Sequence, residues 1–470
     1  MNSRRLSLLA GALIAALLSA CSTPFCNAPG GLCAPGQANT SPAPLPRPAP
    51  MQTGLPKPPP EPPPPAAQTF SITLPGGAAV ADADGDRPAL AAPLAARRAD
   101  ENAMPSNTPI RIGLLLPTRS ETLGAAADSL RAGFMAAWER DRDNITVTLL
   151  ETGDVPQDVL SAYAKALQDQ DLVVGPLARS AVGTVAASPL VSKPTIALNY
   201  PEGHGQPGAA PLPDNMVVIG LSIEEEARQA AQWAAAEHPG RSALILTTNT
   251  AWQRRVAAAF AGQWQRLGLA VRMVELSAPD GYLSDPELVQ LRARLRQDLP
   301  GLLFSAMSAD QTRQLRGALG SALTTEPSNP IFSTADALPP PPPAPTEQFS
   351  NLPIYGTSAL NPGSSTSFAS QDLDGVRLLD LPWKIQRDHP AVMVYPQPVM
   401  AGSADMERLY ALGIDAYRVA REIGRHPSGR FHLDGVTGKL TIDFGRGPAS
   451  FERVEPTAIY QNGVPQAVVQ

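Results

Sequence analysis

From Pro109 onward, short apolar runs rich in β-branched residues alternate with longer stretches in which apolar positions recur every three or four residues. Runs of the first kind predict buried β-strands, and stretches of the second kind predict amphipathic helices. The predicted strands are Ile110–Leu116, Ile145–Leu150, Leu172–Gly175, Thr195–Tyr200, Met216–Leu221, Ala243–Thr247, Val271–Leu276, Leu302–Ser305, Ile331–Ser333, Ile354–Gly356 and Val376–Leu381. The predicted helices are Leu123–Arg140, Val155–Gln168, Ile223–Glu237, Trp252–Leu267 and Pro286–Gln297.

This alternation of strand and helix predicts an α/β fold with parallel sheets, whose strands are joined by helices and covered on both faces. About 360 residues take part, which is more than one hydrophobic core usually holds, so we expect two lobes. One helix start has a more specific signal. Ser222 is followed three residues later by Glu225, which is the spacing of a capping box.

The chain before this region has a different composition. Residues 22–108 are dominated by Pro, Ala and Gly. Such sequence cannot bury enough apolar surface to fold, and its prolines favour extended polyproline geometry. We therefore expect a disordered linker over residues 21–108. A second proline run, Pro339–Pro343, separates two predicted strands and predicts a protruding, poorly ordered loop.

The first residues have the pattern of a secretory signal peptide. Arg4 and Arg5 precede an apolar stretch, Leu8–Leu18, that is too short to span a bilayer. Leu-Ser-Ala then precedes Cys21, which matches the lipobox of bacterial lipoproteins, whose cysteine is diacylated. We therefore expect a signal peptide over residues 1–20 and a lipid anchor on Cys21, with Ser22 in the position that favours the outer membrane. The alternative is an ordinary cleaved signal followed by a chance cysteine.

Charge and cysteine content exclude several classes of function. The net charge is −6 and the basic residues are scattered, which argues against nucleic acid as a partner. Cys26 and Cys33 either close a small disulfide loop or remain two free thiols in the linker. The region from Pro109 contains no cysteine, which excludes thiolate metal sites and cysteine nucleophiles there.

The sequence also lacks motifs of catalysis. It has no Gly-x-Ser-x-Gly elbow, no Walker phosphate loop, no His-Glu-x-x-His pair and no Ser-x-x-Lys. Its five histidines lie mostly beside Pro or Gly, as in solvated turns. We therefore expect no enzymatic activity, no cofactor and no metal site.

One segment has the features of a small-ligand site. Gly175–Ser180 runs from a predicted strand end into a helix start, where free backbone N–H groups favour anions. Crevices at the carboxyl ends of parallel strands are the usual ligand positions in open α/β folds. The alternative is that the glycine and proline only form the turn and that Leu177 packs into the lobe. With other residues at comparable strand ends, the candidate cleft residues are Gly175, Arg179, Ser180, Asn199, Tyr200 and Ser222.

Several strings, taken in order, resemble a known family. The most specific are Ala197–Pro201, Arg408–Ala416 and Leu433–Leu440. They are similar to the carboxy-terminal domain of the LppC family, outer-membrane lipoproteins also called penicillin-binding protein activators, over about Ile110–Gln470. The resemblance implies a two-lobed fold similar to type I periplasmic binding proteins. It also implies that the chain stimulates a bifunctional, class A penicillin-binding protein. Well-studied members have a helical domain in the place that the Pro-rich linker occupies here.

The alternation and the resemblance together predict how residues 109–470 divide. One lobe is expected to contain about 109–222 and 357–440. The other is expected to contain about 223–356, with a closing strand near 452–466. The chain would then cross between the lobes three times.

Two residues in the family-like strings have two interpretations each. Trp383 is either an exposed anchor for a partner, because Trp is favoured in binding hot spots, or a core residue at a strand end. Asp415 is either a structural hydrogen-bonding group or a contact with the enzyme. For the chain as a whole, the main hypothesis is a regulator of a peptidoglycan synthase. The alternative is a lipid-anchored protein whose cleft binds or senses an amino acid or a cell-wall fragment.

Overall fold

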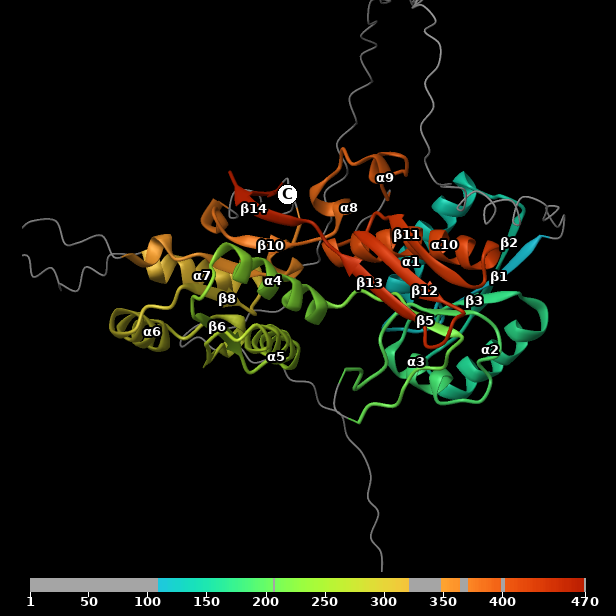
Figure 1. The fold of residues 1–470 in the computed structure, drawn as a ribbon, viewed down its shortest axis with the longest axis horizontal. Helices are drawn as coiled ribbons and strands as arrows, with labels where there is room; N and C mark the ends of the chain where they lie inside the picture. The colour runs from blue at the N-terminus through green and yellow to red at the C-terminus, as the bar shows by residue number, and fades with distance from the viewer. Residues whose placement is uncertain (1–108, 206–207, 321–347, 364–370, 399–401, 469–470) are drawn as a thin grey trace, which may run out of the picture. The chain divides into compact units, whose positions relative to one another are not determined.

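The computed structural model describes residues 109–205, 208–320, 348–363, 371–398 and 402–468, and the fold is that of these ranges. The signal segment, the Pro-rich linker with its three cysteines, the predicted strand Ile331–Ser333 and the second proline run lie outside them. The described chain is built around two separate, mainly parallel sheets, and each sheet is the centre of one lobe (Figure 1). The predicted fold class is confirmed.

Lobe 1 contains a five-stranded parallel sheet in the order β2-β1-β3-β4-β5. Helices α1 and α10 pack on one face of the sheet, and α2 and α3 pack on the other. The strands are β1 (Ile110–Leu116), β2 (Ile145–Glu151), β3 (Leu172–Val174), β4 (Thr195–Ala197) and β5 (Met216–Val218). The helices are α1 (Gly124–Arg140), α2 (Pro156–Asp169), α3 (Arg179–Ala186) and α10 (Ala404–Arg425).

Two glycines allow α1 and α10 to touch through their backbones. A Cβ added at Gly133 would lie 1.9 Å from the carbonyl oxygen of Tyr410, and one added at Gly413 would lie 2.0 Å from that of Leu130. No other residue type fits such an approach without moving a helix. This contact joins the first helix of the described residues to a helix almost three hundred residues later, at the centre of lobe 1.

A small antiparallel sheet completes lobe 1. It consists of β11 (Gly429–Asp434), β12 (Lys439–Phe444) and β13 (Ser450–Val454). The apolar side chains of β12 join the lobe 1 core, while its other face is more exposed, which is the usual arrangement of an antiparallel sheet beside a core. The sequence analysis did not predict this sheet.

Lobe 2 contains a seven-stranded sheet in the order β15-β14-β10-β9-β8-β6-β7. Helices α4 and α5 pack on one face, and α6 and α7 contribute to the core on the other. The strands are β6 (Ala243–Thr248), β7 (Val271–Leu276), β8 (Leu302–Ser305), β9 (Ile354–Gly356), β10 (Arg377–Leu379), β14 (Thr457–Gln461) and β15 (Val464–Ala467). The helices are α4 (Ile223–Glu237), α5 (Ala251–Arg266), α6 (Asp285–Gln297) and α7 (Ala309–Gly320).

Strand β10 corrects the expected division of the chain. We expected 357–440 in lobe 1, but β10 pairs with β9 and β14 of lobe 2 and buries Leu378 in the lobe 2 core. The single closing strand expected near 452–466 is three strands, of which β13 belongs to lobe 1 and β14 and β15 to lobe 2. The chain therefore passes between the two sheets near Gly220, Asp380 and Glu455.

The other predicted elements agree with the structure. Each predicted helix, and each predicted strand inside the described ranges, corresponds to an element that overlaps it. The pattern missed α7, and the short helices α8 (Pro382–Ile385) and α9 (Pro390–Met393). Among the helices of the described ranges, none combines the length and the apolar character that crossing a membrane requires.

Candidate functional site

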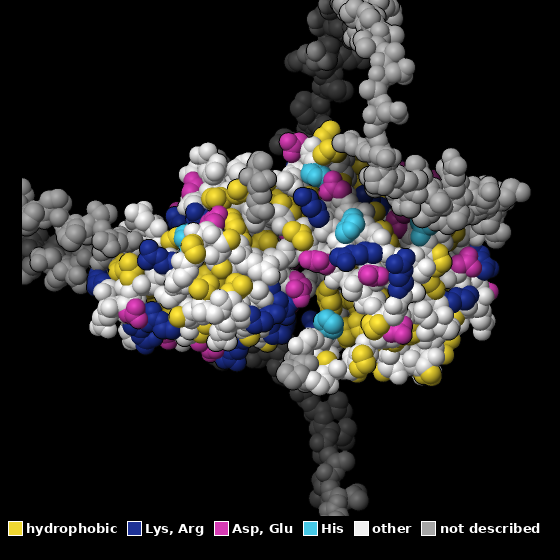
Figure 2. Space-filling model, viewed as in Figure 1, with side chains coloured by type: hydrophobic (Ala, Val, Ile, Leu, Met, Phe, Trp, Pro, Cys, Tyr) yellow, Lys and Arg dark blue, Asp and Glu magenta, His cyan; other side chains and the backbone are white. Residues whose placement is uncertain are grey.

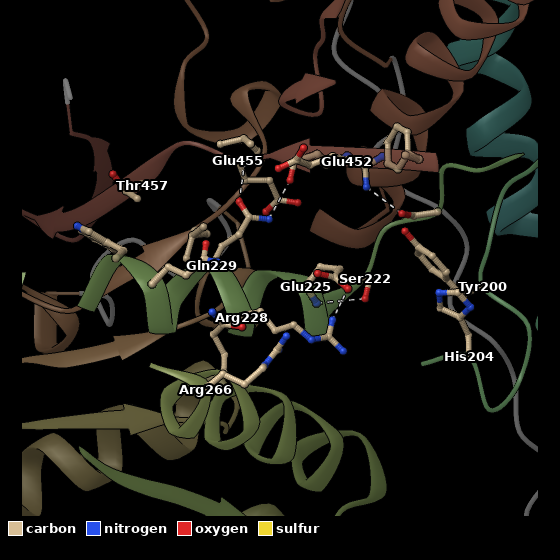
Figure 3. Close-up of a pocket in the computed structure, with 18 residues that line it drawn as sticks. Tyr200, His204, Ser222, Glu225, Arg228, Gln229, Arg266, Glu452, Glu455 and Thr457 are labelled. Carbon is tan, nitrogen blue, oxygen red and sulfur yellow. Dashed lines mark hydrogen bonds and ion pairs between the residues drawn. The ribbon is translucent and has the colours of Figure 1, made fainter. Parts of the chain in front are cut away.

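A cavity of about 520 Å³ lies between the two lobes (Figure 3). Tyr200 and His204 line it from lobe 1, and Arg228 and Arg266 line it from helices α4 and α5 of lobe 2. In the space-filling view, basic side chains gather beside this hollow on the lobe 2 side (Figure 2). The size is in the range of small-molecule sites, which is about 300–1,000 Å³.

The structure brings together four of the six predicted cleft residues. Arg179, Asn199, Tyr200 and Ser222 line a second hollow of about 640 Å³, which shares Tyr200 and Ser222 with the first. Arg179 is the first residue of α3, which follows β3, and the other three residues lie in the segments after β4 and β5, as the strand-end argument predicts.

The other two predicted cleft residues lie elsewhere. Gly175 has φ +117°, and a Cβ there would lie 2.1 Å from the carbonyl oxygen of Leu115, so it is required by the turn. Ser180 lines a separate pocket beside α3. Leu177 is buried in the lobe 1 core. The ligand interpretation is therefore wrong for Gly175, and Ser180 does not belong to the interlobe cleft.

Ser222 and Tyr200 shape the edge of the cleft. The Ser222 hydroxyl accepts a hydrogen bond from the Glu225 N–H at 3.2 Å, so it is the N-cap of α4 that the sequence predicted. The Tyr200 ring stacks on His204 with centroids 4.7 Å apart. Burial raises the pKa of Tyr200 and lowers the pKa of His204, so both side chains are neutral near pH 7.

Several charged groups that line the cleft are already paired. Arg228 forms an ion pair with Glu225, and Arg255 donates to Glu224 at 2.8 Å. Burial alone would raise the pKa of Glu224, but the hydrogen bond from Arg255 contributes to holding it below its usual value. Arg453 donates to two backbone carbonyls of the first crossing, at 2.7 and 2.8 Å. These groups therefore satisfy one another within the protein.

A second group of charges is buried where the crossings meet. Arg408 of α10 donates to both carboxylate oxygens of Asp380, at 3.0 and 2.8 Å. The same guanidinium donates to the carbonyl oxygens of Ser358 and Asn361, at 2.9 and 2.8 Å. Both residues belong to lobe 2, in and directly after the 3-10 turn Ser358–Leu360. Arg408 therefore ties a lobe 1 helix to the lobe 2 side of the second crossing.

Two further carboxyl groups belong to this buried group. Glu226 of α4 accepts hydrogen bonds from the N–H and the hydroxyl of Ser358, at 2.7 and 3.0 Å. Glu455 lies at the third crossing, and among the described residues its Oε2 atom has no hydrogen-bond partner. Burial raises the pKa of Glu226 to about 7 and that of Glu455 well above its usual value. We call Glu226, Asp380, Arg408 and Glu455 the joint cluster.

The two predicted partner contacts are buried. Asp415 accepts hydrogen bonds from the N–H of Val436 at 3.1 Å and from the N–H and hydroxyl of Thr437 at 2.8 and 2.7 Å. It therefore fixes the turn between β11 and β12. Trp383 is fully buried in the lobe 1 core, and its backbone N–H donates to the carbonyl of Val436 at 3.0 Å. The partner-contact interpretation is wrong for both residues, because neither has a surface that a partner could touch.

The sequence analysis missed most of the joint cluster. Glu226 stands in a run of three glutamates at a helix start, which is the usual composition of a solvated first turn. Only Asp380 carried a usable signal, because a carboxylate inside the apolar run Val376–Leu381 must be buried with a partner. Arg453 and Glu455 stand on either side of Val454 at the end of a strand, and such alternation of charged and apolar residues is also typical of an exposed edge strand. Within the described ranges, no group of three or more His, Cys, Asp or Glu side chains could hold a metal ion.

Two lobes built on separate parallel sheets, three crossings and a cavity between the lobes define a domain of the type I periplasmic-binding-protein-like class. The family model described as "LppC putative lipoprotein" matches residues 94–447. The chain belongs to the LppC family.

Curated relatives carry one functional name. "Penicillin-binding protein activator LpoA" of Vibrio cholerae serotype O1 is 27% identical over 368 residues, which are 73% of this chain and 55% of the relative. The protein of the same name from Pantoea ananatis is 29% identical over 319 residues, which are 63% of this chain and 44% of the relative. The chain thus spans about half the length of these curated relatives.

Two solved structures are similar in fold. The LpoA C-domain from Haemophilus influenzae, described as a regulator of PBP1A, has a TM-score of 0.57 and 22% identity, and the match covers 76% of this chain and 100% of that one. A Chromobacterium violaceum protein, described as a "putative branched-chain amino acid ABC transporter", has a TM-score of 0.57 and 31% identity over 75% of this chain and 100% of that one.

Proposed function

We propose that this protein is a regulator of the cell envelope, not an enzyme, and that it binds and stimulates a bifunctional, class A penicillin-binding protein. The LppC family match over residues 94–447 is the observation that carries the proposal, and the name of the curated relatives supports it. A regulator that binds the active conformation of the synthase more tightly shifts its population toward that conformation, by no more than the difference in affinity.

The contact with the synthase is expected on the exposed surface of the lobes. Trp383 and Asp415 are excluded from it by burial, and the paired charges of the cleft are already used within the protein. The test is the rate of glycan polymerisation and peptide cross-linking by the organism's own class A synthase, with and without the purified chain carrying Cys21→Ala. Stimulation at saturating concentration is expected. Absence of both stimulation and binding would overturn the proposal.

The anchor and location are part of the same proposal. Membership of the LppC lipoprotein family supports a lipoprotein of the cell envelope, and the lipobox points to acylation of Cys21 and an outer-membrane location facing the periplasm. The expected linker over residues 21–108 would then set the reach of the domain toward the synthase. Cys21→Ala should move the protein from the membrane to the soluble fraction, whereas Cys26→Ala should not. Retention of Cys21→Ala in membranes would contradict the anchor.

Solute binding is the second candidate function. It is favoured by the cavity of about 520 Å³ and by the description of the Chromobacterium violaceum relative. Arg179, Asn199, Tyr200 and Ser222 would then line the ligand. Calorimetric titration with amino acids and soluble cell-wall fragments tests it. Tight binding without stimulation of the synthase would favour this candidate over the first.

A further inference from the structure

The three crossings between the lobes bring their charged groups to one buried place. Glu226 comes from the helix that follows the first crossing, Asp380 lies at the second and Glu455 at the third. Arg408 reaches the same place from α10 of lobe 1. All four residues are at most 8% exposed, so water screens their charges only weakly. Any change in the arrangement of the lobes must therefore disturb this cluster.

The charges within the cluster do not balance when every group is ionised. Three carboxylates and one guanidinium give a net charge of −2, and the guanidinium is already bonded to Asp380. Glu226 and Glu455 repel each other and are both repelled by Asp380. Buried charges without partners are costly, so carboxyl groups in this position retain protons.

The neighbouring charged groups do not remove this imbalance. Asp405 of α10 pairs with the outer nitrogen of Arg408 and adds a further negative charge. Arg453 of β13 attracts Glu455 and offsets the charge of Asp405, so the net charge stays at −2, and its guanidinium also donates to Thr437 and to two carbonyls of the first crossing. On the lobe 2 side, the charges of Arg313 and Asp380 both act on the Tyr460 phenol, which donates to the carbonyl of Leu360, while Arg313 forms an ion pair with Asp310.

We propose that the joint cluster is a proton-operated latch: Glu226 and Glu455 hold protons while the lobes are arranged as in this structure, and release of these protons to solvent shifts the lobes toward another arrangement. The Oε2 atom of Glu455 is buried and has no hydrogen-bond partner among the described residues, so nothing there would stabilise a negative charge on this carboxylate. The inference concerns the lobes alone and does not depend on the synthase.

The contacts around the latch explain how it would act on the lobes. The Glu455 N–H donates to Gln229 of α4 at 3.0 Å, and the Gln229 amide donates to the Arg453 carbonyl at 2.9 Å. Gln229 therefore bridges lobe 2 and the third crossing beside the ionisable Glu455 (Figure 3). Repulsion between the ionised glutamates would strain this bridge, because Glu226 and Gln229 belong to α4 whereas Glu455 lies at the third crossing. A ligand or partner that prefers one lobe arrangement would in turn change proton binding.

The test measures the distance between the lobes as a function of pH. Val155→Cys of lobe 1 and Tyr282→Cys of lobe 2, both exposed, carry a fluorescent donor and acceptor on the full chain with its three native cysteines replaced by serine. Energy transfer is recorded from about pH 5 to about pH 9. We expect a change with a midpoint near pH 7, from the pKa of Glu226. A transfer efficiency that does not change over this range would overturn the proposal.

Isosteric variants identify the groups responsible. Glu226→Gln together with Glu455→Gln should remove the pH-dependent change and keep the low-pH distance, because amides cannot ionise. Glu121→Gln, at an exposed position of lobe 1, should leave the change intact. Persistence of the change in the double variant would overturn the proposal. If the double variant fails to fold, the protonated carboxyl groups of the native chain are titrated by infrared spectroscopy. We expect their absorption to be lost around pH 7, and an absorption that does not change around this pH would contradict the latch.

Discussion

The joint cluster and the cleft are both polar, lie close together and contain arginine and glutamate, but they are built differently. In the joint, one guanidinium makes bonds to groups from distant parts of the chain, and the charged side chains are almost fully buried, although Glu455 also lines the cleft. In the cleft, the Arg228–Glu225 pair joins neighbouring turns of one helix, and the solvent is near. Long-range, buried bonds hold architecture, whereas short-range, hydrated pairs contribute little to stability.

The comparison also explains what the family-like strings encode. Arg408, Gly413 and Asp415 fall within one string, and each has a structural role: the first in the joint, the second against α1 and the third at the turn before β12. Residues of this kind identify the domain without identifying its binding surface. A functional difference among similar domains would have to arise on the lobe surfaces or in the cleft.

Arg408→Ala is the variant with the largest expected effect. It leaves the Asp380 carboxylate buried without its cation, which typically costs about 3–5 kcal/mol. The free energy of unfolding, measured by urea denaturation, should fall by that amount. The matched change in the cleft, Arg266→Ala, should alter it by no more than about 0.5 kcal/mol, because Arg266 only donates to a carbonyl of its own helix. Equal losses in the two variants would remove the distinction between joint and cleft.

The pH dependence of stability separates the two regions in a second way. The pKa of Glu226 is about 7 in the folded protein, compared with 4.5 for an ordinary glutamate. The folded state therefore binds the proton more tightly than the unfolded state. Its contribution to stability is complete below about pH 4.5 and declines as the pH rises to about 7. Above that it is constant, and the total change is about 3 kcal/mol.

This contribution is isolated by comparing variants. The unfolding free energy of the native chain and of Glu226→Gln should be measured over the same pH series, and their difference should follow the decline just described. Glu225→Gln, at an exposed position on the cleft side of the same helix, is the matched control for replacing a glutamate by its amide. Parallel profiles for the native chain and Glu226→Gln would show that Glu226 titrates normally.

Gly413→Ala tests the packing beneath the joint. The added methyl group would lie 2.0 Å from the Leu130 carbonyl oxygen, so the helices must separate, at a cost of about 1–3 kcal/mol. Gly262 of α5 is the control, because no heavy atom lies within 4 Å of a Cβ added there. Gly262→Ala should stabilise the protein by up to about 1 kcal/mol. Thermal unfolding of the two variants would therefore shift in opposite directions, and a shift in the same direction would contradict the close approach.

The sequence predicted the two lobes well because their helices and strands have strong local periodicity. It failed at β10, which has only three residues and ends directly before the second crossing. A strand this short has no pattern that shows with which sheet it pairs. Four cleft residues were found because strand ends meet at one edge of a sheet. Glu226 and Glu455 could not be found, since their burial depends on three crossings that converge only after folding.

The smallest expected effect is at the cleft edge. Ser222→Ala removes the hydroxyl that accepts the Glu225 N–H and should cost about 1 kcal/mol in unfolding free energy. Ser284→Ala is matched in chemistry and position, because Ser284 is the N-cap of α6 but forms no capping hydrogen bond with its side chain. Its effect should be close to zero.

The same pair of variants also bears on function. If Ser222 is only a cap, Ser222→Ala should stimulate the synthase as the native chain does under conditions in which both are fully folded. If the cleft binds a solute through this hydroxyl, the affinity for that solute should fall in Ser222→Ala and remain unchanged in Ser284→Ala. Loss of synthase stimulation in Ser222→Ala alone, with folding intact, would mean that the cleft takes part in activation.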